Sequence, residues 1–232
     1  MRTVEPDPDA PATPMPKARR RRGSVTRDNV LRAALDLVDR DGLDALSMRR
    51  LAGHLDVETM SLYKRVASKD DLLAGIAEVL WAEVAAAAAP SVDWRAWLGA
   101  FGHAIRTVAM AHPHAVSLLV AGEVFPPALL EVIATQLEHV ESRGVSRSDA
   151  VNAMCTVTAF ALGCTMAERA CFGPDHKATS ERQQIRRIAR ALPPDTDDRI
   201  LDTALTVCGC DPDDMFHQGL DLIIRGSCTG CD

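Results

Sequence analysis

Residues 46–65 read LSMRRLAGHLDVETMSLYKR, and this stretch decides the fold of the N-terminal part. Ser47 is a good N-cap for a short helix that runs to Leu55, because a serine side chain can accept a hydrogen bond from a free amide in the first turn. Residues 56–58 then form a tight turn, and a third short helix is expected from residue 58 or 59 to Arg65. Two short helices joined by such a turn are typical of a helix-turn-helix.

Two further helices are predicted on either side of this pair. Thr26 is an N-cap for a helix over about residues 27–41, whose apolar side chains recur at helical spacing until Gly42 ends it. Ser68 is an N-cap for a fourth helix that runs to about Ala89, with two aspartates in its first turn, where carboxylates suit the positive end of the helix dipole. The helix-turn-helix therefore has a longer supporting helix before it and a long helix after it.

The third helix is expected to expose most of its surface. Leu62 and Val66 are four residues apart and can pack inward together, whereas the other side chains are hydroxyls, a phenol, a thioether and cations. Such groups can bond phosphates and base edges of DNA. The side chains concerned are Thr59, Met60, Ser61, Tyr63, Lys64 and Arg65, to which Lys69 adds a cation beside the first amides of the fourth helix. The alternative is that Tyr63 closes a small core and that the cations are merely solvated.

The distribution of charge also separates the N-terminal part from the rest. The net charge of the chain is -6, but residues 17–75 hold 13 Lys/Arg against 9 Asp/Glu, and residues 76–232 hold 12 against 20. A basic segment on an acidic body indicates a polyanionic partner for that segment alone. No apolar run approaches the roughly 18 residues of a membrane span, and no signal peptide is evident, so a cytoplasmic protein without membrane contact is expected.

The sequence predicts an all-α protein in three parts. Residues 1–23 are rich in proline and are expected to be a disordered extension that ends in a basic arm, with Arg21 and Arg22 as candidate DNA contacts. Residues 24–72 form the helix-turn-helix domain, and residues 73–232 form a helical body. Helices of the body are expected at about 93–111, 114–120, 127–142, 147–171, 180–191, 197–207 and 213–227, with a mobile polar loop over 174–196.

The order of motifs in the N-terminal part closely resembles the DNA-binding domain of TetR-type transcriptional repressors. The resemblance lies in AALDL at residues 33–37, Gly42, LSMRRLA at 46–52, LDV at 55–57, SLY at 61–63 and SKDDLL at 68–73. It implies a homodimer that places two reading heads in successive major grooves of a palindromic operator. It further implies base contacts at Arg49, Thr59, Met60 and Ser61, phosphate contacts at Tyr63, Lys64 and Lys69, and either role for Arg65.

The C-terminal part is similar to the tetracycline repressors in TQLEHVESRGVSRSDA (residues 135–150), FALGC (160–164) and FHQGLDLIIRG (216–226). This likeness implies that the long helix near 147–171 and the last helix form a four-helix bundle with their counterparts in a second subunit. Both helices carry stripes at helical spacing that serve either as interface or as intramolecular core. The interface candidates are Met154, Thr158, Ala161, Leu162, Thr165, Phe216, Leu220 and Ile223.

The resemblance implies a small-molecule effector inside the body. A mostly apolar wall with a few polar groups is predicted from Trp97, Phe101, Ile105, His114, Leu119, Glu123, Gln136 and Phe160. Gln136 matches a polar residue that contacts the drug in tetracycline repressors, whereas Leu119 stands where those proteins carry the histidine that holds the drug-bound magnesium. An effector more apolar than a metal–tetracycline chelate is therefore expected, and no cofactor.

Two other functions compete with a ligand-responsive regulator. A helical small-molecule binding protein without operator specificity would leave the basic head unexplained. The pairs Cys208/Cys210 and Cys228/Cys231 have CxC and CxxC spacing that suits a zinc or thiol sensor. The last helix would hold these two pairs roughly 22 Å apart, which disfavours a shared metal. No catalytic motif with defined spacing is present, so an enzyme is not expected.

Overall fold

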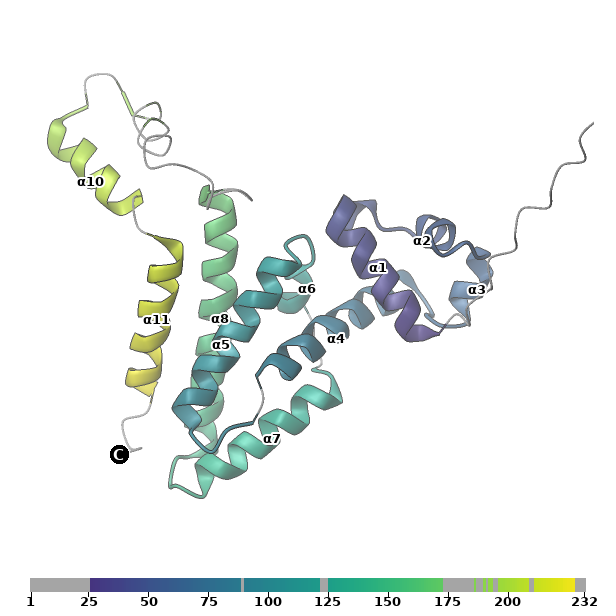
Figure 1. Cartoon of the computed structure of the whole chain (residues 1–232), viewed down its shortest axis with the longest axis horizontal. Helices are drawn as coiled ribbons and strands as arrows, with labels where there is room; N and C mark the ends of the chain where they lie inside the picture. The colour runs from purple at the N-terminus through teal and green to yellow at the C-terminus, as the bar shows by residue number, and fades with distance from the viewer. Residues whose placement is uncertain are drawn as a thin grey trace, which may run out of the picture.

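The computed structural model describes residues 26–88, 90–121, 125–172, 186, 190, 192–193, 196–208 and 211–227. Over these ranges every regular element is a helix, which confirms the all-α expectation. Figure 1 shows a small head and a larger body, joined by the long helix α4 (Lys69–Ala87).

The head consists of α1 (Arg27–Asp41), the 3-10 turn η1 (Leu43–Ala45), α2 (Met48–Leu55) and α3 (Thr59–Tyr63). Three helices begin where a serine or threonine hydroxyl satisfies a free amide: Thr26 accepts from Asn29 N–H at α1, Ser47 from Arg50 N–H at α2 and Ser68 from Asp71 N–H at α4. Each bond supplies a partner that the first turn of a helix lacks. The predicted caps are thus confirmed, and η1 is an addition that the sequence pattern did not indicate.

The body consists of α4 together with α5 (Trp94–Ala111), α6 (Val116–Ala121), α7 (Pro127–Glu141), α8 (Arg147–Phe172), α10 (Asp198–Cys208) and α11 (Pro212–Ser227). These bounds lie within about two residues of the expected ones. α5 packs on α4, α8 and α11, and α8 packs on α7 and α11. Figure 1 shows α11 alongside α8 and places α10 at the outer end of the molecule.

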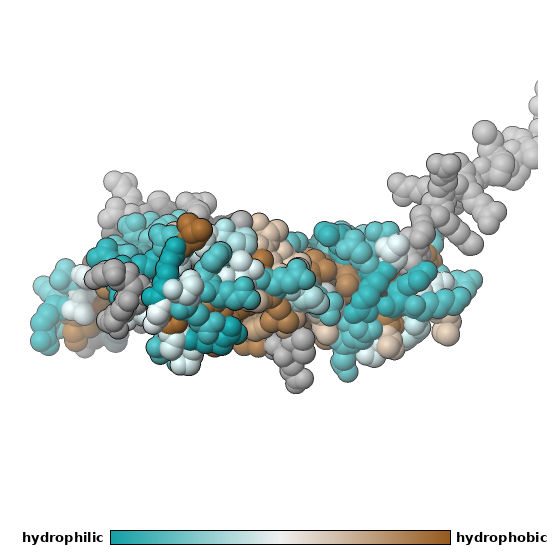
Figure 2. All heavy atoms as spheres, turned by 90° about the horizontal axis from the view of Figure 1, so that it is seen from below, coloured by the Kyte–Doolittle hydropathy of each residue, from teal (hydrophilic) through white to brown (hydrophobic). Residues whose placement is uncertain are grey.

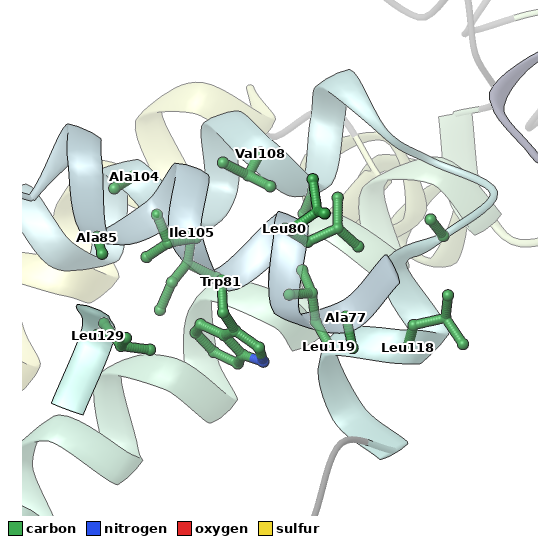
Figure 3. Close-up of a cluster of buried hydrophobic side chains, with 14 of the residues drawn as sticks. Ala77, Leu80, Trp81, Ala85, Ala104, Ile105, Val108, Leu118, Leu119 and Leu129 are labelled. Carbon is green, nitrogen blue, oxygen red and sulfur yellow. The ribbon is translucent and has the colours of Figure 1, made fainter. Parts of the chain in front are cut away.

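The core of the body lies where α4, α5, α6 and α7 meet. Figure 3 shows Leu80 and Trp81 of α4 beside Ile105 of α5, Leu119 of α6 and Leu129 of α7, all of them buried. Close approach of helices depends on glycine at several places, of which Gly75 and Gly102 are examples. A Cβ on Gly75 would overlap Leu31 of α1, and a Cβ on Gly102 would lie 2.9 Å from Leu220 Cδ1 of α11 and 3.0 Å from Val157 Cγ1 of α8.

One expectation about α8 needs correction. By length and composition its residues 147–170 are apolar enough to cross a membrane, although the sequence was expected to hold no such run. In the fold the inner face of α8 packs against α5 and α11, and Ala153, Val157 and Ala161 are buried there. Part of the apolar character of α8 therefore serves the core of the body.

Several predictions fall outside the described residues. They concern the extension at residues 1–23 with Arg21 and Arg22, and most of the segment 174–196 with the helix expected near 180–191. The expected domain boundary between residues 72 and 73 lies within α4, so the head and the body share a continuous helix.

Candidate functional site

The turn between α2 and α3 fixes the direction of α3. Asp56 adopts the left-handed conformation, with φ 53°, and its N–H bonds back to the carbonyls of Ala52 and Gly53. Val57 N donates to the Ala52 carbonyl at 3.0 Å. Leu62 and Val66 are then buried against the head core, as their spacing predicted. The opposite side of α3 consequently faces away from the protein.

The side chains predicted to contact DNA form this outward surface. Met60 is 68% exposed and Tyr63 45% exposed, so neither side chain is part of the head core. Thr59 and Ser61 are half-buried, and the exposed cations beside them are Arg49, Lys64, Arg65 and Lys69. Figure 2 shows that hydrophilic side chains predominate on the head over the face drawn there.

Some cations of the head form ion pairs with carboxylates of the same chain, and others do not. Arg32 pairs with Asp28, Arg40 and Arg50 both pair with Asp41, and Arg27 pairs with Asp71. In contrast, within the described part of the chain none of Arg49, Lys64, Arg65 and Lys69 forms an ion pair. The cations around α3 are therefore available to an external anion, whereas the cations on the other faces of the head are neutralised internally.

An Arg27–Asp71 pair, which the sequence pattern did not reveal, holds the loop between α3 and α4. Two nitrogens of Arg27 donate to the two carboxylate oxygens of Asp71, at 3.1 and 2.8 Å, and Arg27 also donates to the carbonyl of Arg65. Asp71 accepts from the N–H of Ala67 at 2.7 Å. The Arg27 guanidinium, aided by that N–H, lowers the pKa of Asp71 below its usual value. This network fixes Arg65 and the start of α4, where Lys69 lies.

Within the body, four of the residues predicted to line the ligand site are packed together in the core. Trp97, Phe101, Ile105 and Leu119 are buried, and the ring of Trp97 stacks between Trp94 and Phe101 with centroids 5.2 and 5.0 Å apart. The indole N–H of Trp97 donates to the Ala88 carbonyl at the end of α4. A role in ligand contact stays a prediction for these residues.

The polar residues predicted for the ligand site lie in different surroundings. Gln136 is only 1% exposed, and with its amide oriented by its partners it donates to the Ser91 carbonyl at 2.9 Å and accepts from Ser91 N–H at 3.1 Å. Gln136 thus connects the loop between α4 and α5 to α7 through two hydrogen bonds. His114 is exposed, Phe160 stacks on Phe216 of α11, and Glu123 lies outside the described residues. A role in ligand contact stays a prediction for these side chains as well.

The role of the residues chosen for a subunit interface stays a prediction, and most of their surface is covered within one chain. Met154, Ala161, Leu162, Thr165, Phe216 and Leu220 are buried within a single chain, between α8, α11 and α5, and Thr158 and Ile223 are partly buried. The buried side chains therefore leave little surface for a second copy, whereas Thr158 and Ile223 leave more. The stripes mark the intramolecular side of both helices. Their outer sides carry different residues, among them Met166, 50% exposed, and Leu222, 70% exposed.

A buried group of charges joins α5, α8 and α11. The Arg106 guanidinium lies 2.7 Å from Glu168 Oε2 and 2.6 Å from Asp213 Oδ1, and it covers the ring of Phe216 at 4.7 Å. Burial raises the pKa of the nearby Cys164 thiol and lowers the pKa of His103. Nothing in the helical spacing indicated this network, because the ion pairs join residues far apart in the sequence.

Of the seven cysteines, the structure describes the side chains of Cys155 and Cys164. Cys155 is exposed and Cys164 is only partly buried. The side chains of Cys208, Cys210, Cys228 and Cys231 are not among those described. Over the described ranges no group of three or more His, Cys, Asp or Glu side chains could hold a metal ion.

Comparisons with known proteins agree with this geometry. Residues 30–76 match the family model for bacterial regulatory proteins of the tetR family, and residues 87–229 match the tetracyclin repressor-like C-terminal domain. The chain is 30% identical over 203 residues to the tetracycline repressor protein class A from transposon 1721 of Escherichia coli, covering 86% of this chain and 88% of that protein.

Solved structures show the same arrangement. A possible TetR family transcriptional regulator from Streptomyces coelicolor A3(2) is 29% identical, with a TM-score of 0.69, over 86% of this chain and 97% of that one. ActR from Streptomyces coelicolor, in complex with actinorhodin, is 23% identical, with a TM-score of 0.70, over 90% and 99%. The chain therefore belongs to the TetR family of DNA-binding transcriptional regulators, which combine a helix-turn-helix head with a ligand-binding C-terminal domain.

Proposed function

We propose that this chain is a homodimeric repressor that binds a palindromic operator and leaves it when a small, rather apolar molecule enters the body. The observation that carries the DNA-binding part is the outward face of α3, where the exposed cations around Met60 and Tyr63 have no carboxylate partner among the residues that the structure describes. Such a face suits the major groove and its flanking phosphates.

The side chains of the head divide into two roles. Arg49, Thr59, Met60 and Ser61 read base edges, with Met60 suited to the methyl group of a thymine. Tyr63, Lys64 and Lys69 contact phosphates, and Arg65 reaches either target. The start of α4 supports a phosphate contact beside Lys69, because free amides of the first turn lie there, although Ser68 satisfies the amide of Asp71.

The second subunit is expected on the outer sides of α8 and α11. Both helices lie at the same side of the body, and their exposed apolar side chains include Met166, Met215 and Leu222. A two-fold arrangement would pair each face with its own copy and bring four helices together. The same two-fold axis would place the two heads over two half-sites of a palindrome.

Release follows from a ligand that favours one of two body conformations. The tetracycline repressor and ActR with actinorhodin are regulators of this family whose names point to small molecules. An apolar effector is expected here because Leu119, Ile105 and Trp97 are apolar and none of them supplies a metal ligand. The coupling between ligand and operator would be about 1–3 kcal/mol. We infer a cytoplasmic location and no catalytic activity.

The proposal is tested by selecting bound fragments from a random DNA pool at near-physiological salt, because low salt masks specificity. A recovered palindrome is the expected result. Recovery of no motif by folded protein would refute operator binding and would direct attention to the cysteines at the C-terminus.

Variants then test the division of roles. Tyr63→Phe and Lys69→Ala should weaken binding equally on all sequences, and Lys69→Ala should also reduce the salt dependence. Arg49→Ala should relax the preference at one operator position. Uniform loss in all three variants would contradict the assignment of base contacts.

A further inference from the structure

His112 connects the head to the body through two carboxylates. It follows the last turn of α5, and its Nδ1 lies 2.7 Å from Asp39 Oδ2 of α1, while its Nε2 lies 3.1 Å from Glu83 Oε2 of α4. Each ring nitrogen thus lies within hydrogen-bond distance of one carboxylate oxygen, and a nitrogen that carries a proton donates to the carboxylate beside it. One side chain of the body therefore bonds to the head and to the helix that joins the two parts.

The environment of this bridge is more enclosed than that of an ordinary surface pair. The His112 side chain is 18% exposed and that of Asp39 is 27% exposed. Asp39 Oδ1 is shielded from solvent and has no hydrogen-bond partner in the described part of the chain, so compensation of its charge depends on the bond between Oδ2 and His112. Loss of the imidazole would leave a partly buried carboxylate without its partner, which is costlier than loss of an exposed pair.

The bridge lies where it can restrict the orientation of the head relative to the body. α1 packs on α2 and on α4, and α4 alone continues by covalent bonds from the head into the body. A single helix permits the head to twist and tilt about it, whereas a second attachment at the C-terminal end of α1 opposes both movements. The bridge lies far along the chain from the reading residues of α3 and contacts none of them. Its effect on DNA is therefore one of head orientation.

We propose that the Asp39–His112–Glu83 bridge fixes the orientation of the head and thereby sets the spacing between operator half-sites that the dimer accepts. This inference rests on the proposed dimeric operator binding. A dimer reads two half-sites at once, so the distance and the twist between its heads determine which spacing fits. Without the bridge each head samples more orientations, and operators with altered spacing lose less affinity. Base preferences within a half-site are unaffected, because α3 and its side chains are unchanged.

The test compares the selected palindrome with versions that carry one base pair more or one fewer at the centre. Affinity is measured by fluorescence anisotropy for the full-length protein. The wild-type protein is expected to lose about tenfold or more on either altered operator, in the range of a single mismatch in a specific site. His112→Asn and Asp39→Asn should reduce this spacing penalty at least threefold. Glu83→Gln should have a smaller effect, because it leaves the bond from His112 to α1 in place.

His139→Asn is the matched control, since His139 is an exposed histidine of α7 to which no function is assigned, and no contact of its side chain is seen within the described residues. It should retain the wild-type penalty. Far-UV circular dichroism and thermal unfolding check that each variant is folded. If His112→Asn does not fold, the spacing penalty of Asp39→Asn alone tests the proposal.

The outcomes separate this inference from the proposed function. Lower affinity of both bridge variants on all operators, with an unchanged spacing penalty, would overturn the inference and leave operator binding intact. A wild-type protein that selects no palindrome would refute the proposed function, and the inference with it.

Discussion

Replacement of Arg106 by methionine should be among the most damaging single changes in the body. The Arg106 side chain is 9% exposed and that of Glu168 is fully buried, with 2.7 Å between Nη1 and Oε2. Arg106→Met keeps most of the side-chain volume but leaves the Glu168 carboxylate buried without this cation. Removing one partner of a buried ion pair costs about 3–5 kcal/mol of unfolding free energy. We take this range to include the loss of the contact between the guanidinium and the Phe216 ring.

The assay is urea unfolding followed by circular dichroism, at one fixed protein concentration because dimerisation would link stability to concentration. The expected loss corresponds to a fall of about 6–20 °C in Tm, at about 2–4 °C per kcal/mol for a chain of this size. Asp213→Asn is the matched control: the Asp213 side chain is 45% exposed, and its loss should cost about 0–1 kcal/mol.

A second variant separates charge from packing. Arg106→Met combined with Glu168→Met removes both buried charges, and it should recover a large part of the stability that Arg106→Met loses. The reasoning is refuted if Arg106→Met costs no more than Asp213→Asn. It is also refuted if the double variant is less stable than Arg106→Met alone.

Three further predictions concern the packing and the polar contacts of the fold. Gly102→Ala should lower the unfolding free energy by about 1–3 kcal/mol, because its Cβ would press on Leu220 and Val157, and Gly53→Ala, which has open space, is the control in the same thermal scan. Gln136→Leu should cost about 1–3 kcal/mol by leaving Ser91 N–H and C=O unpaired, and a Tm equal to that of the wild type would contradict the pinning of the α4–α5 connection. Asp71 has a lowered pKa in the folded protein, so its stabilising effect is complete above the unfolded value of about pH 4 and is lost as the pH falls through the lowered folded value. Asp71→Asn should therefore have a lower Tm than the wild type at pH 7, and the difference should shrink towards pH 3; a constant difference would exclude ionisation as its source.

Local signals in the sequence were sufficient for the helices and for the reading face. Thr26, Ser47 and Ser68 are caps whose partners lie three residues away, and Leu62 and Val66 share one face of a short helix. Such interactions depend on near neighbours, so spacing alone predicts them. The exposure of Met60 and Tyr63 followed from the same reasoning.

What the sequence did not show depends on residues that are distant along the chain. Phe216 and Leu220 form an apolar stripe, but a stripe does not indicate whether its partner is α8 of the same chain or a second copy. Arg106 is 107 residues from Asp213, and His112 is 73 residues from Asp39. A charged residue in a helix is usually solvated, so these pairs are visible only once the tertiary contacts are known.

Because α4 is long, a small tilt at its body end produces a large displacement at its head end. Its 19 residues place Lys69 roughly 27 Å from Ala87, at about 1.5 Å per residue. With that arm, a tilt of about 5° at the body end displaces the reading end by about 2.4 Å. Two subunits tilting in opposite senses would change the separation of their heads by about 5 Å, which exceeds the rise of one base pair, about 3.4 Å. In the proposed dimer, a rearrangement in the core no larger than a side-chain adjustment would thereby become a misfit of a whole base-pair step on the DNA.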